Sequence, residues 1–198
     1  MLARSVRGVT LIELIIGIAV LAILLALGIP AFTQALQNAR LRATADSFTA
    51  GLQLARAEAI KRNGRVELLI TNDDPVATMV DAATASATGV TTGMNWIVRY
   101  INPTTGFHDF VEGKSSLEGA PASDTTVTVN ATNTTITFNA FGATTLGAAA
   151  TFQFENPPGG ACVAASGPMR CLNIVVTPGG QIKMCDPSIS TMGDTRKC

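Results

Sequence analysis

The feature that most constrains this chain is an uncharged, apolar stretch near its start, LIIGIAVLAILLALGIPAF at residues 14–32. A helix rises about 1.5 Å per residue, so this stretch spans about 28 Å, close to the thickness of the hydrocarbon layer of a bilayer. The residues before it carry Arg4 and Arg7 and no acid up to Gly8, which predicts a cytoplasmic N-terminus with the remainder outside. The sequence therefore predicts a helix that crosses a membrane.

One acid, Glu13, stands directly before this stretch. A charge inside hydrocarbon costs about 3 kcal/mol even on lenient scales, so such residues are rare and generally have a partner or a function. A secretory signal cleaved at Ala26-Leu27-Gly28 and a plain uncleaved anchor are both compatible with the apolar stretch. Neither alternative explains an acid at its edge.

The run GVTLIEL at residues 8–14 closely resembles the prepilin signature of type IV pilins and type II secretion pseudopilins. The resemblance implies that a prepilin peptidase cuts after Gly8, removes a leader of residues 1–8 and methylates Val9, which stands where phenylalanine is more usual. It implies that Glu13 pairs with the N-terminal ammonium of a neighbouring subunit, so that two costly charges compensate each other. It also implies that Pro30 bends the helix. Residues 9–32 would then form the transmembrane and assembly helix.

Beyond this segment, residues 33–64 have the pattern of an amphipathic helix. Six residues at alternating steps of four and three predict one buried face: Leu41, Ala45, Phe48, Leu52, Ala55 and Ala59. Glu58 and Arg62 are four residues apart and predict a surface ion pair. Asn63-Gly64 predicts the C-cap of the helix.

The rest of the chain, residues 65–198, has short β-branched or aromatic runs separated by turn residues. The ranges 134–139 and 151–155 alternate as half-buried antiparallel strands do. The region from Asp73 to Thr92 is rich in small residues and predicts a mobile surface loop. The fold class expected is α+β, with a long N-terminal helix packed on an antiparallel β-sheet domain. The expected strands are residues 65–71, 95–101, 107–111, 125–129, 134–139, 151–155, 172–177 and 181–184.

Two further segments resemble one branch of the pilin family. Residues 51–63, GLQLARAEAIKRN, resemble the helix end of the GspH/FimT branch, and residues 170–187 look like the end of FimU-like minor pilins. Residues 67–169 match no family pattern. The branch resemblance implies a minor subunit of a pilus or of a secretion system.

All four cysteines, Cys162, Cys171, Cys185 and Cys198, lie at the C-terminal end. An even count in a Gly- and Pro-rich region behind a membrane-targeting segment predicts two disulfides formed in an oxidising compartment. Of the three possible pairings, Cys162 with Cys171 and Cys185 with Cys198 is favoured because each closes a short loop. A metal site is not expected, because the cysteines are not in close pairs and the single histidine is distant.

No catalytic motif stands out in the sequence. His108 lies in Phe107-His-Asp-Phe110, where strand alternation predicts an exposed side chain, and G-x-S-x-G, H-E-x-x-H and phosphate-binding glycine loops are absent. The chain is therefore not expected to be an enzyme or to need a cofactor.

DNA binding finds limited support. The charges of the 14 basic and 14 acidic residues cancel, so the chain as a whole has no excess positive charge to attract DNA. Some FimT proteins bind DNA through a Gly-Arg-x-Arg motif, which Gly180-Gln-Ile-Lys183 matches without either arginine. Lys183, Arg196 and Lys197 are candidates for weak DNA contacts.

The function expected from the sequence is that of a minor type IV pilin, built at low copy into the tip or priming complex of a pilus. The alternatives are a minor pseudopilin of a type II secretion system and a DNA receptor for natural transformation. The expected partners are other minor and major pilins, the prepilin peptidase, the inner-membrane assembly platform and the membrane itself. Before assembly the chain would sit in the bacterial inner membrane with its globular domain in the periplasm, and after assembly at the cell surface. Because Glu13 is present, an internal place in the tip complex is expected.

Overall fold

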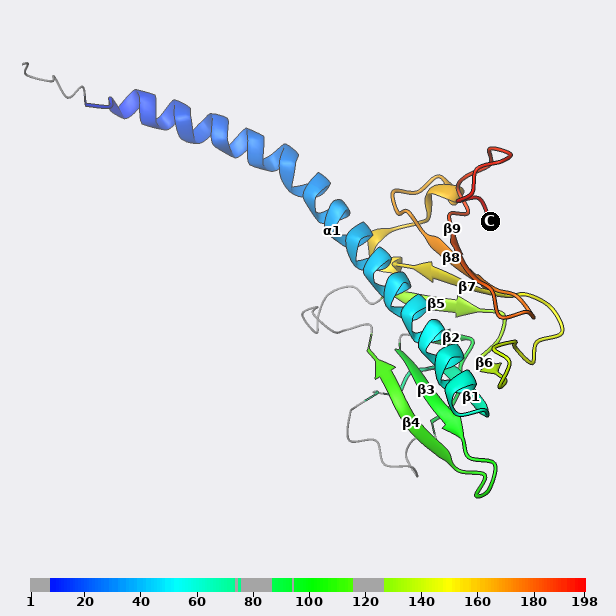
Figure 1. Cartoon of the computed structure of the whole chain (residues 1–198). Helices are drawn as coiled ribbons and strands as arrows, with labels where there is room; N and C mark the ends of the chain where they lie inside the picture. The colour runs from blue at the N-terminus through cyan, green and yellow to red at the C-terminus, as the bar shows by residue number, and fades with distance from the viewer. Residues whose placement is uncertain (1–7, 74, 76–86, 94, 116–126) are drawn as a thin grey trace, which may run out of the picture. The chain divides into compact units, whose positions relative to one another are not determined.

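The computed structural model describes residues 8–73, 75, 87–93, 95–115 and 127–198 (Figure 1). The chain divides into two compact units, Met1–Leu36 and Gln37–Cys198. One helix, α1 (Leu11–Lys61), contributes its first half to the first unit and its second half to the other.

In the first unit, the described apolar side chains of α1 are exposed to the surroundings. Leu11 is 77% exposed, Leu24 62% and Ile29 58%. Within the described residues, α1 is the one helix long and apolar enough to cross a membrane. A helix that is apolar all round and has no protein around it is suited to lipid. The helix continues through Pro30, and the bend expected there stays a prediction.

In the second unit, α1 buries one face. All six side chains of the predicted stripe, from Leu41 to Ala59, are at most 1% exposed, so this prediction is confirmed. The helix ends in a Schellman-type cap in which the Gly64 amide donates to the Ala59 carbonyl at 3.0 Å. Asn63 takes the left-handed conformation with a φ of 46°, as the predicted C-cap requires.

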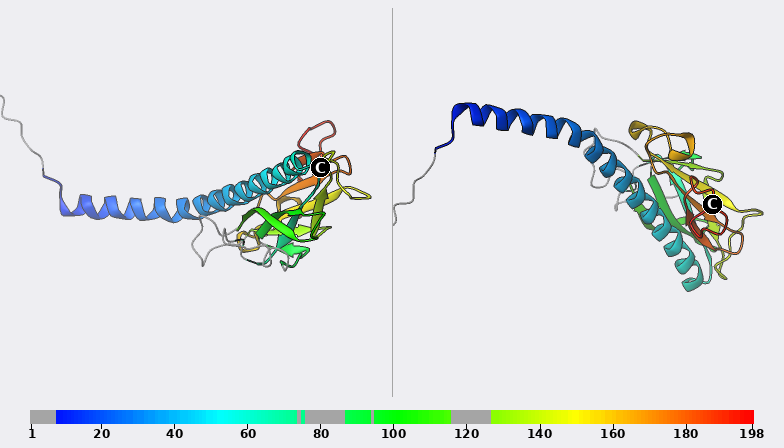
Figure 2. Two further views of the ribbon diagram at one scale, coloured as in Figure 1. Left: turned by 60° about the horizontal axis from the view of Figure 1, so that its bottom comes forward. Right: turned by 90° about the horizontal axis from the view of Figure 1, so that it is seen from above.

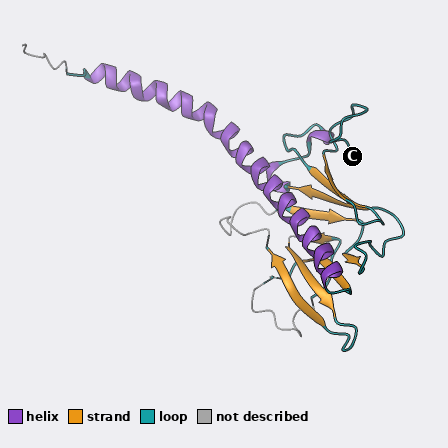
Figure 3. Cartoon of the chain, viewed as in Figure 1, coloured by secondary structure: helices purple, strands orange, loops and turns teal. Residues whose placement is uncertain are grey.

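Two antiparallel sheets pack on this face of α1, which confirms the predicted fold class (Figures 2 and 3). The first sheet has the order β4-β3-β1-β6, and the second has the order β2-β5-β7-β8-β9. The strands are β1 (Arg65–Thr71), β2 (Thr92–Gly93), β3 (Asn95–Ile101), β4 (His108–Lys114), β5 (Thr128–Ala131), β6 (Thr135–Phe138), β7 (Ala150–Glu155), β8 (Leu172–Val176) and β9 (Ile182–Cys185).

The centre of the core is an aromatic cluster between the helix and the second sheet. The ring of Phe48 lies 5.0 Å from that of Phe152 and 5.3 Å from that of Phe154, measured between centroids. The alternation predicted for β6 and β7 is observed, since every second residue of each strand is buried. This alternation is how residues as far apart in sequence as Phe48 and Phe154 come to share one core.

The C-terminal region is closed by two disulfides. Cys162 bonds to Cys171 and Cys185 bonds to Cys198, which are the two local pairs that the sequence favours. The second bond holds the tail beside the end of β9, where the Asp186 amide also donates to the Arg196 carbonyl at 2.7 Å. The C-terminal residue is therefore fixed to the sheet.

The expectation of a surface loop from Asp73 to Thr92 was wrong for part of that range. Residues 74 and 76–86 lie outside the described residues, but Ala87 is buried against Leu69 and Ile97. The Val90 amide donates to the Ile70 carbonyl at 2.9 Å, and Thr92 begins the short strand β2. A two-residue strand of Thr and Gly carries no alternation, which is why the sequence pattern did not reveal it.

Candidate processing and assembly site

The first turn of α1 is fixed by a reciprocal pair of hydrogen bonds between Thr10 and Glu13. The Glu13 amide donates to Oγ1 of Thr10 at 3.3 Å, and the Thr10 amide donates to Oε2 of Glu13 at 3.5 Å. The first helical hydrogen bond then runs from the Leu14 amide to the Thr10 carbonyl at 3.2 Å. This is a capping box, with Thr10 at the N-cap and Glu13 at the third helical position.

The expected cleavage site lies immediately outside this cap. Gly8, Val9 and Thr10 are exposed and precede the first residue of α1, Leu11. A side chain added at Gly8 would meet no atom within 4 Å. The Gly8–Val9 peptide bond is thus in open, non-helical backbone, a form that a peptidase can engage without unwinding a helix.

Glu13 is exposed at the first turn of a helix whose next residues are apolar. No lysine or arginine in the described parts of the chain forms an ion pair with it. The capping box satisfies Oε2, but it leaves the charge of Glu13 uncompensated by an opposite charge. A carboxylate in this position is stabilised by the positive end of the helix dipole and remains available for a cation from outside the chain.

The three basic residues considered for DNA contact are largely engaged within the C-terminal tail. Nζ of Lys183 donates to the Lys197 carbonyl at 2.8 Å, which brings those two residues together. The Arg196 guanidinium is held by both carboxylate oxygens of Asp194, at 3.1 and 2.8 Å. This hydrogen-bonded pair lowers the pKa of Asp194 to about 2 and raises the pKa of Arg196. Arg196 therefore already has a carboxylate partner within the tail, with which a phosphate would have to compete.

Gly180, the first residue of the segment compared with the DNA-binding motif, is buried in a turn. Its φ is +79°, and a Cβ there would lie 2.0 Å from the Gly142 carbonyl oxygen. Only glycine fits such a left-handed position against another backbone segment. The backbone conformation and the close contact therefore explain the glycine at position 180 without any role in binding a nucleic acid.

His108 is not the fully exposed strand residue that alternation predicted. Its side chain is 24% exposed, and Nε2 lies 3.4 Å from Oε1 of Glu67, which also accepts a hydrogen bond from Nε of Arg99 at 2.5 Å. Burial, with the nearby Arg99 charge, lowers the pKa of His108 despite the proximity of Glu67 and Asp109. The cross-strand pairing of β1 with β3, and of β3 with β4, places these three residues on neighbouring strands.

Glu58 also departs from the simple surface pair expected with Arg62. It is only 9% exposed and accepts hydrogen bonds from both Lys61 at 2.9 Å and Arg62 at 2.7 Å. These hydrogen bonds, first from Lys61 and then from Arg62, lower the pKa of Glu58. The two cations neutralise an acid that sits beside the core at the end of α1.

Within the described ranges, no three His, Cys, Asp or Glu side chains gather where they could hold a metal ion.

The capping box was not predicted from the sequence, although the pattern Thr-x-x-Glu at residues 10–13 signals one.

Comparisons with known proteins agree with this organisation. A family model described as type II transport protein GspH matches residues 44–180, and one described as the prokaryotic N-terminal methylation motif matches residues 3–29. Comparison with curated proteins finds no match.

Two solved structures are similar in fold, both of the type IV minor pilin FimU from Pseudomonas aeruginosa in different crystal forms. The first has a TM-score of 0.51 and 15% identity, covering 77% of this chain and 92% of that chain. The second has a TM-score of 0.48 and 13% identity, and the match covers 76% of this chain and 97% of that chain.

Proposed function

Because this chain belongs to the GspH family of pilin-like proteins, we propose that it is a minor type IV pilin, built at low copy into the tip or priming complex of a pilus. The members of such a family are structural subunits, and the features that define them are a methylated N-terminus and an apolar helix. The apolar helix and prepilin motif fit anchoring in the inner membrane before assembly.

The observation that carries the proposal is the Thr10–Glu13 capping box at the head of an exposed apolar helix. It makes α1 begin at Leu11, so the Gly8–Val9 bond lies outside the helix, where the prepilin peptidase can cut it and then methylate Val9. It also presents one carboxylate, Glu13, at the edge of the apolar segment. After cleavage, the ammonium of Val9 in one subunit and Glu13 in the next provide the two halves of an ion pair.

The pairing gives Glu13 a defined role in assembly. An unpaired carboxylate is costly among packed apolar helices, whereas the pair is favourable only in the correct stagger of neighbouring subunits. Glu13 therefore sets the register between subunits. A subunit that caps a filament has no neighbour above it, so the presence of Glu13 favours an internal place in the tip complex.

The orientation follows from the leader. Arg4 and Arg7 stay in the cytoplasm, and the domain built on Gln37–Cys198 folds in the periplasm, where its two disulfides form. The partners are then other minor and major pilins, the prepilin peptidase and the inner-membrane assembly platform.

A minor pseudopilin of a type II secretion system is the second candidate, because the family model that matches residues 44–180 is described as type II transport protein GspH. Pilus and pseudopilus subunits share the signature and the helix. The two disulfides at the C-terminus favour the pilus, which is exposed outside the cell and benefits from covalent closure. A role as a DNA receptor is less favoured, since Arg196 is paired with Asp194.

Mass spectrometry of the chain, coexpressed with a prepilin peptidase, tests the processing step. The mature N-terminus is expected to be methylated Val9. An intact Met1, or a cut after Gly28, would contradict the proposal. Immunodetection in sheared pili and in the secretion pseudopilus of the same cells then decides between the two assemblies.

A further inference from the structure

A groove runs between α1 and the C-terminal strands of the second unit. Its volume is about 510 Å³, and three arginines line it, Arg42 from α1, Arg170 before β8 and Arg196 from the tail. Leu172 and Met184, both half-buried, form apolar parts of the lining. Because Asp194 already pairs with Arg196, the free positive charge of the groove comes chiefly from Arg170, beside an apolar surface.

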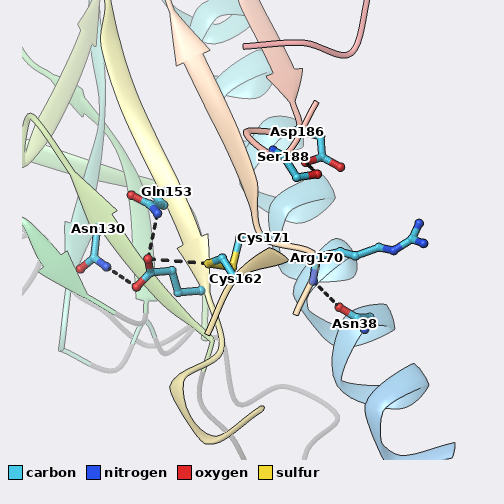
Figure 4. Close-up of a disulfide and its surroundings, with 9 residues drawn as sticks. Asn38, Asn130, Gln153, Cys162, Arg170, Cys171, Asp186 and Ser188 are labelled. Carbon is cyan, nitrogen blue, oxygen red and sulfur yellow. Dashed lines mark hydrogen bonds between the residues drawn. A yellow bond between two sulfur atoms is a disulfide. The ribbon is translucent and has the colours of Figure 1, made fainter. Parts of the chain in front are cut away.

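The walls of the groove are rigidly held. Oδ1 of Asn38 on α1 accepts a hydrogen bond from the Arg170 amide at 2.8 Å, which ties the second wall to the helix (Figure 4). Arg170 precedes Cys171 of the first disulfide, and Arg196 lies in the loop that the Cys185–Cys198 bond closes. The backbone around the groove is thus fixed before an occupant binds, and binding has to order only the arginine side chains.

The charges of the groove favour an anionic occupant. Arg170 has no ion-pair partner in the described parts of the chain, and Figure 4 shows its side chain extending away from the Cys162–Cys171 disulfide. Arg42 lies 3.9 Å from Asp46 in an exposed pair, which is weak. The one acid in the lining, Asp186, already accepts hydrogen bonds from the amide and hydroxyl of Ser188.

We propose that this groove binds an acidic segment of a neighbouring pilin, with a carboxylate on Arg170 and an apolar side chain against Leu172 and Met184. The proposal rests on the proposed function, because it takes the partner to be another subunit of the same filament. A concave surface with an apolar lining suits a peptide better than a phosphate backbone, which binds rows of exposed cations.

The test uses the full chain in cells that assemble pili. Arg170→Glu is expected to lower the amount of the chain in sheared pili about tenfold, since it places like charges against each other. Arg65→Glu, at an exposed position at the start of β1, is the matched control and is expected to incorporate as the wild type does. For both variants, the amount of protein in the cell, the cleavage of the leader and the formation of both disulfides are checked against the wild type. Arg42→Glu, on the opposite wall, replaces Arg170→Glu if that variant fails this check.

A photo-crosslinking amino acid at Ala39, which lines the groove, identifies the occupant, with the same probe at Thr104 as control. The expected product is a peptide of another pilin that contains Asp or Glu. Changing that acid to Arg is expected to restore the incorporation of Arg170→Glu.

The two proposals fail in different ways. If the wild type is in pili and Arg170→Glu is present at the same level, the groove proposal is wrong and the proposed function stands. A crosslink to DNA, to a second copy of this chain or to a segment without acids overturns the groove proposal as well. Absence of the wild type from pili contradicts the proposed function, and the groove proposal falls with it.

Discussion

Thr10 and Glu13 hold each other at the first turn of α1, each accepting a hydrogen bond from the backbone amide of the other. The same carboxylate is the group proposed to pair with a neighbouring subunit. Before assembly the box keeps Glu13 at the head of the helix, where the dipole favours a negative charge. Local helix capping and assembly therefore use one side chain.

Replacing Thr10 by Val is expected to weaken the start of α1. The substitution keeps the shape of the side chain but removes the oxygen that accepts from the Glu13 amide, at a cost of about 1 kcal/mol. Amide hydrogen exchange at Leu11–Leu14, measured on the chain in detergent micelles, should become faster. Thr10→Ser retains the oxygen and should exchange as the wild type does, and an unchanged rate in Thr10→Val would count against the capping box.

Replacing Phe48 by Ala is expected to destabilise the second unit strongly. The ring is 1% exposed and contacts both Phe152 and Phe154, so its removal leaves a cavity and costs about 3–5 kcal/mol. Urea unfolding followed by circular dichroism measures the change. Phe141→Ala is the control, because that ring is 90% exposed and should change the free energy of unfolding little. Similar losses in the two variants would refute the assigned core.

Removing the C-terminal disulfide by the double change Cys185→Ser and Cys198→Ser is expected to lower the free energy of unfolding by about 3 kcal/mol in the chain-entropy estimate. The tail would also be released from the end of β9. The double change at Cys162 and Cys171 should have a similar or slightly smaller effect, because its loop is shorter, with a separation of 9 residues against 13. Thermal unfolding with and without reductant measures the effect. An unchanged Tm on reduction would contradict the prediction that the disulfides stabilise the second unit.

The stability of the second unit is expected to fall on acidification below about pH 6.5. The pKa of His108 is lowered in the folded chain, chiefly by burial and then by Arg99, so below its ordinary value the unfolded state binds more protons than the folded state. Unfolding midpoints in urea from pH 7 to pH 5 measure the effect. The midpoint should change less with pH in His108→Gln than in the wild type. An equal change in the two proteins would contradict the role of His108 in this pH dependence.

The helix and most strands could be predicted because their patterns are local. The spacing from Leu41 to Ala59 identified the buried face of α1, and the β-branched runs gave the bounds of β1 and β3 as observed. The bounds of the other expected strands differ from the observed ones by one to three residues at one or both ends, because strand ends depend on pairing rather than on propensity. β2 has two residues and was not predictable from pattern at all.

The sites were predictable only where sequence neighbours form them. GVTLIEL contains the processing and assembly residues within one turn, so Gly8, Val9 and Glu13 could be named together. The ion-paired setting of His108 depends on the register of β1, β3 and β4, and the arginine-lined groove depends on the packing of β8 and β9 against α1. No local pattern specifies these contacts between distant parts of the chain.

The proposed role of Glu13 depends on its negative charge, and Glu13→Gln removes that charge while keeping the shape of the side chain. Glutamine can still accept the hydrogen bond from the Thr10 amide, as in capping boxes that use Gln, but it cannot pair with an ammonium. The measurement is the amount of the chain in sheared pili relative to its amount in the inner membrane, after confirming cleavage to Val9. We expect Glu13→Gln and Glu13→Val both to be inserted and cleaved but to be depleted from pili to a similar extent. Wild-type incorporation of Glu13→Gln would contradict the proposed role, because the hydrogen bond alone would then suffice.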